Sequence, residues 1–361
     1  MRRGKKLLYA LILAGGRGTR LYPLSRSKNP KQFLKMVDNK SFLKSTVDRI
    51  KPLVGEDNIY VVTNEEYIDK VYEELPEIKK ENVFIEPANK ETATCIGLSA
   101  VKLLKKDSNA TMIVLPSDHY IENDKVFIET LIQADETAEK KMGLTAIGVC
   151  PTRPETGYGY VEMGGRVEGD IETYKVERFL EKPNLEVAKD IIIKGTYLWN
   201  SGMFVWRADV FLREMQKYLP KMYKSMMTIY RHLGTDAESQ IIKEEYSRID
   251  GISVDFGIMQ RTRKAYIIKC EFVWDDIGTF NALGRFLNNS MDNDVIGNTM
   301  LEQCENCKVF ARDKLIIGFG VKDLVIVDSD DVILVMDKNK DQEIKYLVNK
   351  LRDSKNMERY L

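Results

Sequence analysis

Residues 7–33 read LLYALILAGGRGTRLYPLSRSKNPKQF, an apolar run followed by a loop rich in glycine and basic residues. The uninterrupted apolar run 7–14 is typical of a strand buried on both faces of a parallel sheet. The basic residues before it also fit the start of a secretory signal, but the glycine loop follows with no polar spacer or cleavage-like sequence. We therefore interpret the stretch as the first strand of the fold and the loop that leaves it.

Strand-like and helix-like segments alternate from this strand to residue 150. The strand-like runs are 7–13, 58–63, 83–86, 111–115 and 144–149, and the amphipathic stretches are 41–51, 65–74, 92–106 and 124–141. This alternation predicts an α/β fold, a doubly wound, Rossmann-like parallel sheet with helices on both faces. Ligands of such sheets bind beyond the carboxyl ends of the strands.

The rest of the chain divides into a mixed region and a β-rich region. In residues 150–290 the sequence pattern predicts strands at 158–164, 173–181 and 265–273. It predicts helices at 184–194, 208–232, 236–247 and 278–288. Residues 294–336 are short strands separated by turn residues, which predicts a small β-module, and a final helix is expected at 341–352. The polar sequence at 288–290 marks a boundary between a domain at 1–290 and a domain at 291–361.

Composition excludes several classes of protein. The 361 residues carry 55 basic and 55 acidic side chains, so the formal net charge is zero and no bulk basic surface is available for nucleic acid. The apolar runs are shorter than the ~18 residues of a membrane span, so no membrane partner is expected. Five scattered cysteines indicate a reducing cytoplasm and not a disulfide framework.

The loop after the first strand is the strongest candidate for anion binding. The backbone N–H groups of Gly15, Gly16, Gly18 and Thr19 are free of bulky side chains, and Arg20 and Lys31 add positive charge. Neither G-x-x-x-x-G-K-[ST] nor a complete G-x-G-x-x-G is present, because Leu21 occupies the third glycine position. A tight glycine turn with solvated arginines is the alternative.

Eight motifs in order give a specific resemblance. They are the loop GGRGTRL with PLS and PKQF, EPANKETA (86–93), LPSDHYI (115–121), PTRPETGYGYVE (151–162), RFLEKP (178–183), WNSGMFVW (199–206), SVDFGIM (253–259) and WDDIGT (274–279). With them the chain resembles the sugar-nucleotide pyrophosphorylases, and among these the bacterial mannose-1-phosphate guanylyltransferases.

The resemblance implies an enzyme that transfers GMP from GTP to α-D-mannose 1-phosphate, giving GDP-mannose and pyrophosphate with the help of Mg²⁺. It also implies that the C-terminal module is a left-handed β-helix through which the chain forms a homodimer. The motifs leave open a preference for UTP, dTTP or glucose 1-phosphate, and a non-catalytic sugar-nucleotide sensor is an alternative of another class.

The chemistry of such a reaction identifies the catalytic candidates. Both substrates are anionic, so the protein has to position them and neutralise charge. Arg20 and Lys31 are expected to stabilise the phosphorus centre and the leaving pyrophosphate. Asp118 and Asp276 follow two strands and are expected to hold Mg²⁺, although Asp275 competes with Asp276 and an Asx turn is an alternative for Asp118. The attacking phosphate is already ionised, so His119 is not required as a base.

The resemblance also assigns the binding residues. Those expected at the sugar phosphate are Gly159, Glu181, Lys182, Asn200 and Asp255, and Gln260 departs from the acidic residue usual in the family. Those expected at the nucleotide are Leu13, Gly15, Gly16, Gly18, Thr19, Glu86, Asn89, Thr92 and Ser117. For Glu86 a strand-end or capping role is equally compatible with the sequence.

Two further features favour structural roles. Trp199, Phe204 and Trp206 are expected to be core residues and not a sugar platform. Cys304 and Cys307 form a lone C-x-x-C without the four ligands of a structural zinc site, and are interpreted as small residues at a turn.

Overall fold

The computed structural model describes residues 7–16, 18–36, 39–167, 172–286 and 293–361. The described chain forms two compact units, each assembled from several segments. The first unit contains residues 44–117 and 121–274 together with the N-terminal strand, and the second contains residues 16–43, 118–120 and 275–361. The boundary expected at residue 290 lies outside the described residues, so the division into domains at that point stays a prediction.

The first unit is built on a nine-stranded sheet with the order β3-β2-β1-β4-β9-β6-β10-β8-β7. Its strands are β1 (Leu8–Leu13), β2 (Ile59–Asn64), β3 (Val83–Glu86), β4 (Thr111–Pro116), β6 (Leu144–Val149), β7 (Tyr160–Arg166), β8 (Thr173–Leu180), β9 (Tyr197–Arg207) and β10 (Ala265–Cys270). The first apolar run of the sequence thus forms β1, which pairs in parallel with both β2 and β4. The order β3-β2-β1-β4 is that of a doubly wound sheet.

The sheet is mixed, and this corrects the expectation of a parallel sheet. Strand β9 was not predicted; it lies between β4 and β6 and runs antiparallel to both. Strand β8 is antiparallel to β10, whereas β10 and β6 are parallel.

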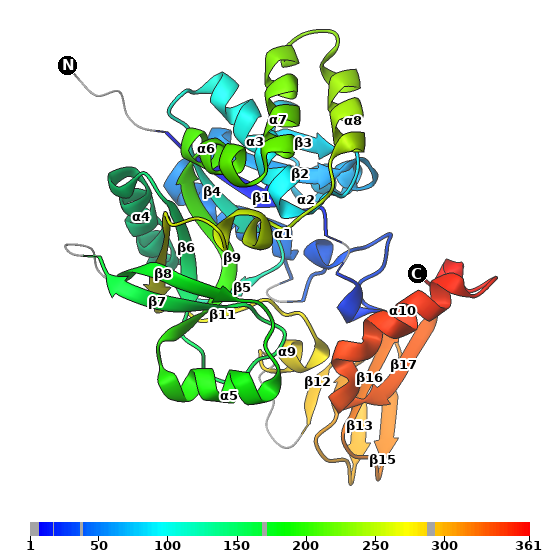
Figure 1. The fold of residues 1–361 in the computed structure, drawn as a ribbon. Helices are drawn as coiled ribbons and strands as arrows, with labels where there is room; N and C mark the ends of the chain where they lie inside the picture. Colours follow the sequence, from blue (N-terminus) through cyan, green and yellow to red (C-terminus); the bar gives the residue numbers. More distant parts are fainter. Residues whose placement is uncertain (1–6, 17, 37–38, 168–171, 287–292) are drawn as a thin grey trace. The chain divides into compact units, whose positions relative to one another are not determined.

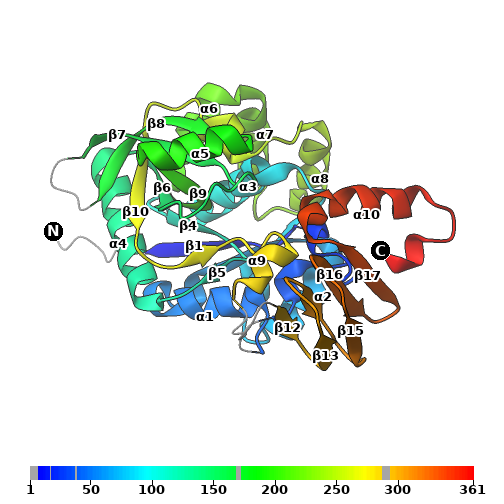
Figure 2. The same cartoon turned by 90° about the horizontal axis from the view of Figure 1, so that it is seen from below.

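Helices cover both faces of this sheet. They are α1 (Phe42–Val54), α2 (Ile68–Glu74), α3 (Glu91–Lys106), α4 (Asp124–Lys141), α5 (Leu185–Lys194), α6 (Ala208–Tyr218), α7 (Pro220–His232) and α8 (Glu238–Arg248). Figure 2 shows α1 and α4 on one side of β1 and α6 and α7 on the other. The single helix expected at 208–232 is two helices, because Pro220 lacks the N–H that a continuous helix needs and instead begins α7.

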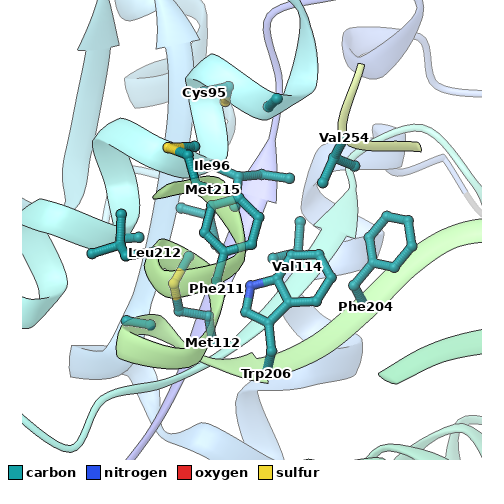
Figure 3. Close-up of a cluster of buried hydrophobic side chains, with 14 of the residues drawn as sticks. Cys95, Ile96, Met112, Val114, Phe204, Trp206, Phe211, Leu212, Met215 and Val254 are labelled. Atoms are coloured by element: carbon teal, nitrogen blue, oxygen red, sulfur yellow. The ribbon is translucent and has the colours of Figure 1, made fainter. Parts of the chain in front are cut away.

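The aromatic residues of β9 belong to the core, as the sequence indicates. Trp206 is fully buried and stacks on both Phe204 and Phe211, with ring centroids 5.0 Å apart in each pair. Figure 3 shows Phe204 and Phe211 beside Trp206, with Met112, Val114 and Met215 around them. Burial of this cluster fixes β9 in the middle of the sheet.

The second unit combines the loop after β1 with the C-terminal strands and α10 (Ile344–Asp353). Its strands β12 (Asp294–Ile296), β14 (Lys308–Phe310) and β16 (Leu324–Ser329) stack in parallel, as do β13 (Thr299–Glu302) and β15 (Ile316–Phe319), and β17 (Val332–Asp337) closes the stack. Two parallel stacks are what a β-helix requires. Figure 1 shows α10 beside β16 and β17.

Short elements complete the two units. They are β5 (Tyr120–Ile121) and β11 (Trp274–Asp275), which pair with each other, α9 (Phe280–Gly284), and the turns Thr19–Leu21 and Lys31–Phe33. In the second unit, Leu21 lies in one buried cluster with Phe280, Val325 and Ile344, and Ser329 donates a hydrogen bond to the Pro23 carbonyl at 3.1 Å. The glycine loop is therefore held by the C-terminal half of its own unit.

Cys304 and Cys307 lie inside the β-helix. Both are buried with Val309, and their thiols donate to the carbonyl oxygens of Glu302 and Glu305, each at 3.4 Å. In the part of the chain that the structure describes, no helix is long and apolar enough to cross a bilayer.

Gly297 is expected to be critical for the β-helix. Its φ is +88°, and a Cβ at this position would lie 1.9 Å from the Ala311 carbonyl oxygen. Gly297→Ala should therefore destabilise the protein by more than about 2 kcal/mol, measured by urea unfolding. Gly320→Ala is the control, because Gly320 also has a positive φ of +67° but no atom within 4 Å of its Cβ position. Equal losses for the two variants would show that steric overlap at Gly297 contributes nothing.

Candidate active site

Gly18 has a backbone conformation and a close contact that only glycine accommodates. Its φ is +57°, and a Cβ would lie 2.5 Å from Cβ of Lys31 and 3.1 Å from Oγ of Ser25. The loop therefore folds tightly over Lys31. At the other end of the loop, the Gly15 carbonyl accepts a hydrogen bond from Nδ2 of Asn64 at 3.0 Å.

Lys31 is the centre of a charged cluster in the second unit. Its side chain is only 5% exposed, and its ammonium donates to Oδ2 of Asp118 at 2.9 Å and to the backbone carbonyl of Asp276. Burial opposes ionisation of Asp118, but the charge and hydrogen bond of Lys31, together with His119 and a backbone hydrogen bond, outweigh this effect and hold the pKa of Asp118 below its ordinary value. The structure thus brings together three of the four predicted catalytic residues.

The two adjacent aspartates after β10 have different environments. Asp275 is buried, and its carboxylate accepts from the Ile277 N–H at 2.8 Å and from Nη2 of Arg285 at 2.5 Å. Asp276 is partly exposed, and its carboxylate accepts from the Gly278 N–H at 2.8 Å. The hydrogen bonds of Asp275 are internal to the fold, so the geometry favours Asp276 as the functional residue of the pair.

Arg20 belongs to the same cluster. Its Nη1 lies 3.2 Å from the point where a Cβ on Gly278 would be, and the Asp276 carboxylate oxygens lie 2.9 and 3.0 Å from that point. A glycine at position 278 therefore keeps space between the Arg20 guanidinium and the Asp276 carboxylate.

The donor set of this cluster fits Mg²⁺. Mg²⁺ prefers hard oxygen ligands and is usually held by one or two carboxylates, with phosphate oxygens and water completing its shell. Asp118 and Asp276 are both partly exposed, and Lys31 joins them by bonding the Asp118 carboxylate and the Asp276 backbone carbonyl. Among the described residues there is no group of three or more His, Cys, Asp or Glu that could form an all-protein cage. The cluster thus fits a metal ion that is held by two carboxylates and takes its other ligands from a phosphate and water.

The sugar-phosphate candidates form a second cluster, at the end of the sheet in the first unit. Nδ2 of Asn200 donates to Oδ1 of Asp255 at 2.8 Å, and the Asn200 N–H donates to the Gly159 carbonyl at 2.8 Å. A Cβ on Gly159 would lie 2.6 Å from Oε2 of Glu181, and Lys182 pairs with Glu181 at 3.2 Å. The structure therefore brings together all five residues that the sequence assigns to the sugar phosphate.

Asp255 and Lys182 have unusual local environments. Burial, with the nearby Glu181 charge, raises the pKa of Asp255 to about 6 against the opposing effect of its bond with Asn200. Lys182 adopts a φ of +44°, which is rare for a residue with a side chain. Backbone strain of this kind is concentrated at functional sites.

The raised pKa of Asp255 predicts a pH dependence of stability. An acid whose folded pKa is above its unfolded value binds a proton more tightly in the folded state, so its contribution to stability falls as pH rises from about 4 to 6. The free energy of unfolding of Asp255→Asn, relative to that of the unsubstituted protein, should therefore rise by about 1–3 kcal/mol between pH 4 and pH 7. Urea unfolding of both proteins across this range measures the difference. A difference that does not change with pH would contradict the prediction.

The EPANKETA segment lies against the segment that carries Asp255. Oγ1 of Thr92 accepts from the Val254 N–H at 2.8 Å, and the Ala93 N–H donates to the Ile252 carbonyl at 3.1 Å. The Asn89 side chain accepts from the Glu91 N–H at 3.3 Å, a local turn bond. The predicted nucleotide and sugar segments are thus physically connected.

Glu86 turns into the protein. It is 6% exposed, its Oε1 accepts from the Tyr246 hydroxyl at 3.1 Å, and burial raises its pKa to about 7. This geometry favours the structural role at the strand end that the sequence left open. Tyr246 and Cys95, which surround the carboxyl group, were not found by sequence reasoning, since nothing in either motif signals them.

The other nucleotide candidates lie at or after the ends of β1 and β4 in the chain. The Ser117 N–H donates to the Leu13 carbonyl at 3.2 Å, which joins the ends of β1 and β4. Thr19 is partly exposed and begins the turn Thr19–Leu21, and Gly16 is exposed. Asn64, which supports Gly15, was also missed, although its position at the carboxyl end of β2 is a usable signal.

The comparison with known families agrees with this fold. The model of the nucleotidyl transferase family matches residues 9–292, and the MannoseP isomerase/GMP-like beta-helix domain matches residues 297–351. The chain therefore belongs to the nucleotidyl transferase family. The predicted combination of a nucleotidyltransferase domain with a C-terminal β-helix is confirmed.

Within this family the chain is similar to bacterial mannose-1-phosphate guanylyltransferases. It is 35% identical to that of Salmonella montevideo, over 96% of this chain and 74% of the relative, and 35% identical to that of Escherichia coli (strain K12), over 96% and 73%. A solved structure from Thermus thermophilus, described as a mannose-1-phosphate geranyltransferase, superposes with a TM-score of 0.86 at 32% identity, covering 96% of this chain and 100% of that one. The resemblance that the motifs indicated is confirmed.

Proposed function

We propose that this chain transfers GMP from GTP to α-D-mannose 1-phosphate and releases GDP-mannose and pyrophosphate. The curated relatives that cover nearly the whole chain support this reaction by their names. The observation that carries the proposal is the cluster in which buried Lys31 bonds both Asp118 and the backbone of Asp276. It supplies fixed positive charge and two carboxylates, which a reaction between two phosphorylated substrates needs.

The reaction is an in-line displacement at the α-phosphorus of GTP. A phosphate oxygen of the sugar attacks this phosphorus, the bond to the β-phosphate oxygen breaks, and pyrophosphate leaves. The Lys31 ammonium and the Arg20 guanidinium stabilise the charge on the phosphorus centre and the leaving group. Because the attacking oxygen is already ionised, no proton has to be removed, and burial lowers the pKa of His119, which favours its neutral form.

Asp118 and Asp276 would hold Mg²⁺ in this proposal. When bound, the ion supplies Lewis-acid stabilisation of the phosphate charges. The backbone N–H groups of Gly15, Gly16, Gly18 and Thr19 contact the triphosphate, with Leu13 and Ser117 beside it, and Asn89 and Thr92 lie at the nucleoside.

The second cluster holds the sugar phosphate. Lys182 binds its phosphate. The side chains of Glu181, Asn200 and Asp255 form hydrogen bonds with the hydroxyl groups of the sugar. The mutual bond of Asn200 and Asp255 orients both side chains before the sugar arrives. Gly159 allows the ring to approach the backbone closely.

Assembly and location are also part of the proposal. We expect a homodimer formed through the C-terminal β-helix, where Ile317 and Phe319 of β15 are 65% and 72% exposed. A cytoplasmic location fits nucleotide substrates and five free cysteines among the described residues. Sedimentation of the purified protein tests the dimer.

A substrate panel tests the reaction. Purified protein with Mg²⁺ should release pyrophosphate fastest from GTP and mannose 1-phosphate, compared with ATP, UTP and dTTP and with glucose 1-phosphate. Omission of Mg²⁺ should abolish turnover. A faster rate with another nucleotide or sugar would replace the substrate assignment, and no turnover in any combination would contradict the enzyme assignment.

A further inference from the structure

The loop between β6 and β7 carries an arginine that the proposed mechanism does not use. Arg153 is partly exposed, and its guanidinium carbon lies 4.8 Å from the centroid of the Trp199 ring and 5.7 Å from that of Tyr158. Its Nε pairs with Oε2 of Glu155 at 3.3 Å, and its Nη2 donates to the Tyr158 hydroxyl at 3.4 Å. A guanidinium can stack on aromatic rings and donate hydrogen bonds from its edge at the same time. Arg153 thus joins two rings and a carboxylate through one side chain.

The two rings belong to a buried aromatic cluster in the first unit. It consists of Tyr158, Trp199 of β9 and Trp274 of β11, which are 6%, 1% and 5% exposed. The ring centroid of Tyr158 lies 5.2 Å from that of Trp199, edge to face, and 5.1 Å from that of Trp274. Because three segments far apart in the sequence meet in this cluster, the contact of Arg153 with two of its rings fastens the loop to β9.

Two rings of the cluster stand next in sequence to residues proposed to bind the sugar phosphate. Tyr158 precedes Gly159, and Trp199 precedes Asn200. The Asn200 N–H donates to the Gly159 carbonyl at 2.8 Å, so these two residues also bond each other. A shift of either ring therefore moves the backbone that carries Gly159 and Asn200. A misplacement of about 1 Å at such a site can lower the rate of a reaction by about 10²-fold.

The surroundings of Arg153 favour an indirect role over direct contact with a phosphate. Glu155 balances its charge, and the guanidinium lies over the Trp199 ring. The other carboxylate oxygen of Glu155 accepts from the Gly157 N–H at 3.1 Å, and the Glu155 carbonyl accepts from the Tyr160 hydroxyl at 2.7 Å. The loop itself therefore sets the orientation of the guanidinium, before any substrate is bound.

We propose that Arg153 is a positioning residue for the sugar phosphate. Through the two rings it holds Asn200 and Gly159 at the separation that the sugar ring requires, and it touches neither substrate itself. This role rests on the proposed function, because it concerns the same binding cluster. Its effect should fall on the sugar phosphate and not on GTP, since none of the residues proposed above to contact GTP belongs to this loop or to β9.

Steady-state kinetics of Arg153→Met tests the proposal. Methionine keeps an unbranched side chain beside the rings but removes the charge and the donors. The KM for mannose 1-phosphate should rise by about tenfold, whereas kcat and the KM for GTP should stay within about twofold. Arg153→Lys keeps a cation over Trp199 and should recover most of the loss. Arg248→Met is the matched control, because Arg248 also pairs with a carboxylate, that of Glu245 at 2.9 Å, and it should leave all three constants unchanged.

Tryptophan fluorescence reports the state of the cluster directly. Two of the three tryptophans of the chain, Trp199 and Trp274, lie in it, with ring centroids 6.5 Å apart. The emission spectrum should change in Arg153→Met and not in Arg248→Met, and thermal unfolding of both variants shows whether the fold is retained.

Glu155→Gln gives a second test that does not depend on the folding of Arg153→Met. The amide oxygen can still accept from the Gly157 N–H, but the charge that pairs with Arg153 is lost. The KM for mannose 1-phosphate should rise by about threefold, the effect of a partly exposed ion pair.

The kinetic outcomes separate this role from a structural one and from the proposed function. A purely structural role would lower the stability and the amount of active protein but leave the KM for mannose 1-phosphate unchanged in Arg153→Met and Glu155→Gln, and this result would overturn the positioning role alone. A fall in kcat with an unchanged KM would also overturn it. Absence of turnover in the unsubstituted protein with every substrate pair would overturn the proposed function, and the role of Arg153 with it.

Discussion

Lys31→Met is expected to lower kcat by about 10²–10³-fold, the usual loss when one fixed donor to a developing phosphate or oxyanion charge is removed. Methionine has a similar length, so the buried side chain still packs against the loop at Gly18. The substitution removes the ammonium that holds Asp118 and the Asp276 carbonyl together. The activity assay is pyrophosphate release at saturating GTP and mannose 1-phosphate.

Lys28→Met is the matched control for this substitution. Lys28 lies three residues earlier in the same loop and is exposed, so its loss should leave kcat within about twofold. Thermal unfolding of both variants shows whether the Lys31 substitution acts through the fold. A Lys31→Met protein with unchanged kcat would remove Lys31 from the catalytic machinery and leave its role purely structural.

The part of the fold that depends on local pattern could be predicted from the sequence. The apolar run 7–14 became β1, the expected strands at 58–63 and 111–115 became its two parallel neighbours, and the expected strand at 83–86 pairs in parallel with the first of these. Strand β9 could not be predicted in the same way, because Asn200, Ser201 and Gly202 interrupt its apolar pattern and suggest a turn. Their polar groups are satisfied by distant partners, since Ser201 bonds Ile147 and Asn200 bonds Asp255.

Prediction of the candidate site from the sequence meets the same limit. The residues brought together around Lys31 and around Asp255 were all predicted, because each follows a strand or lies in a recognised motif. The orientation of Glu86 was not, because it depends on Tyr246, which is 160 residues away in the chain. Contacts of this kind arise from tertiary packing, which neither periodicity nor local spacing records.

The choice between Asp275 and Asp276 leads to the second prediction with a large effect. In Asp276→Asn the Oδ1 atom still accepts from the Gly278 N–H, so the fold should be retained. The variant loses one of the two carboxylates proposed to hold Mg²⁺, and kcat should fall by about 10²–10³-fold. The Mg²⁺ concentration needed for half-maximal rate should also rise.

Asp275→Asn should have the opposite effect, a loss of stability with little loss of turnover. The amide can still accept from the Ile277 N–H, but it no longer supplies the charge that Arg285 binds at 2.5 Å. Loss of this buried, charge-assisted bond should destabilise the protein by about 1–3 kcal/mol, while kcat per folded molecule stays within a few-fold. Measuring turnover and urea unfolding on both variants separates the roles, because each substitution removes one negative charge at adjacent positions. If Asp275→Asn loses turnover without losing stability and Asp276→Asn does not, the assignment of the functional aspartate has to be reversed.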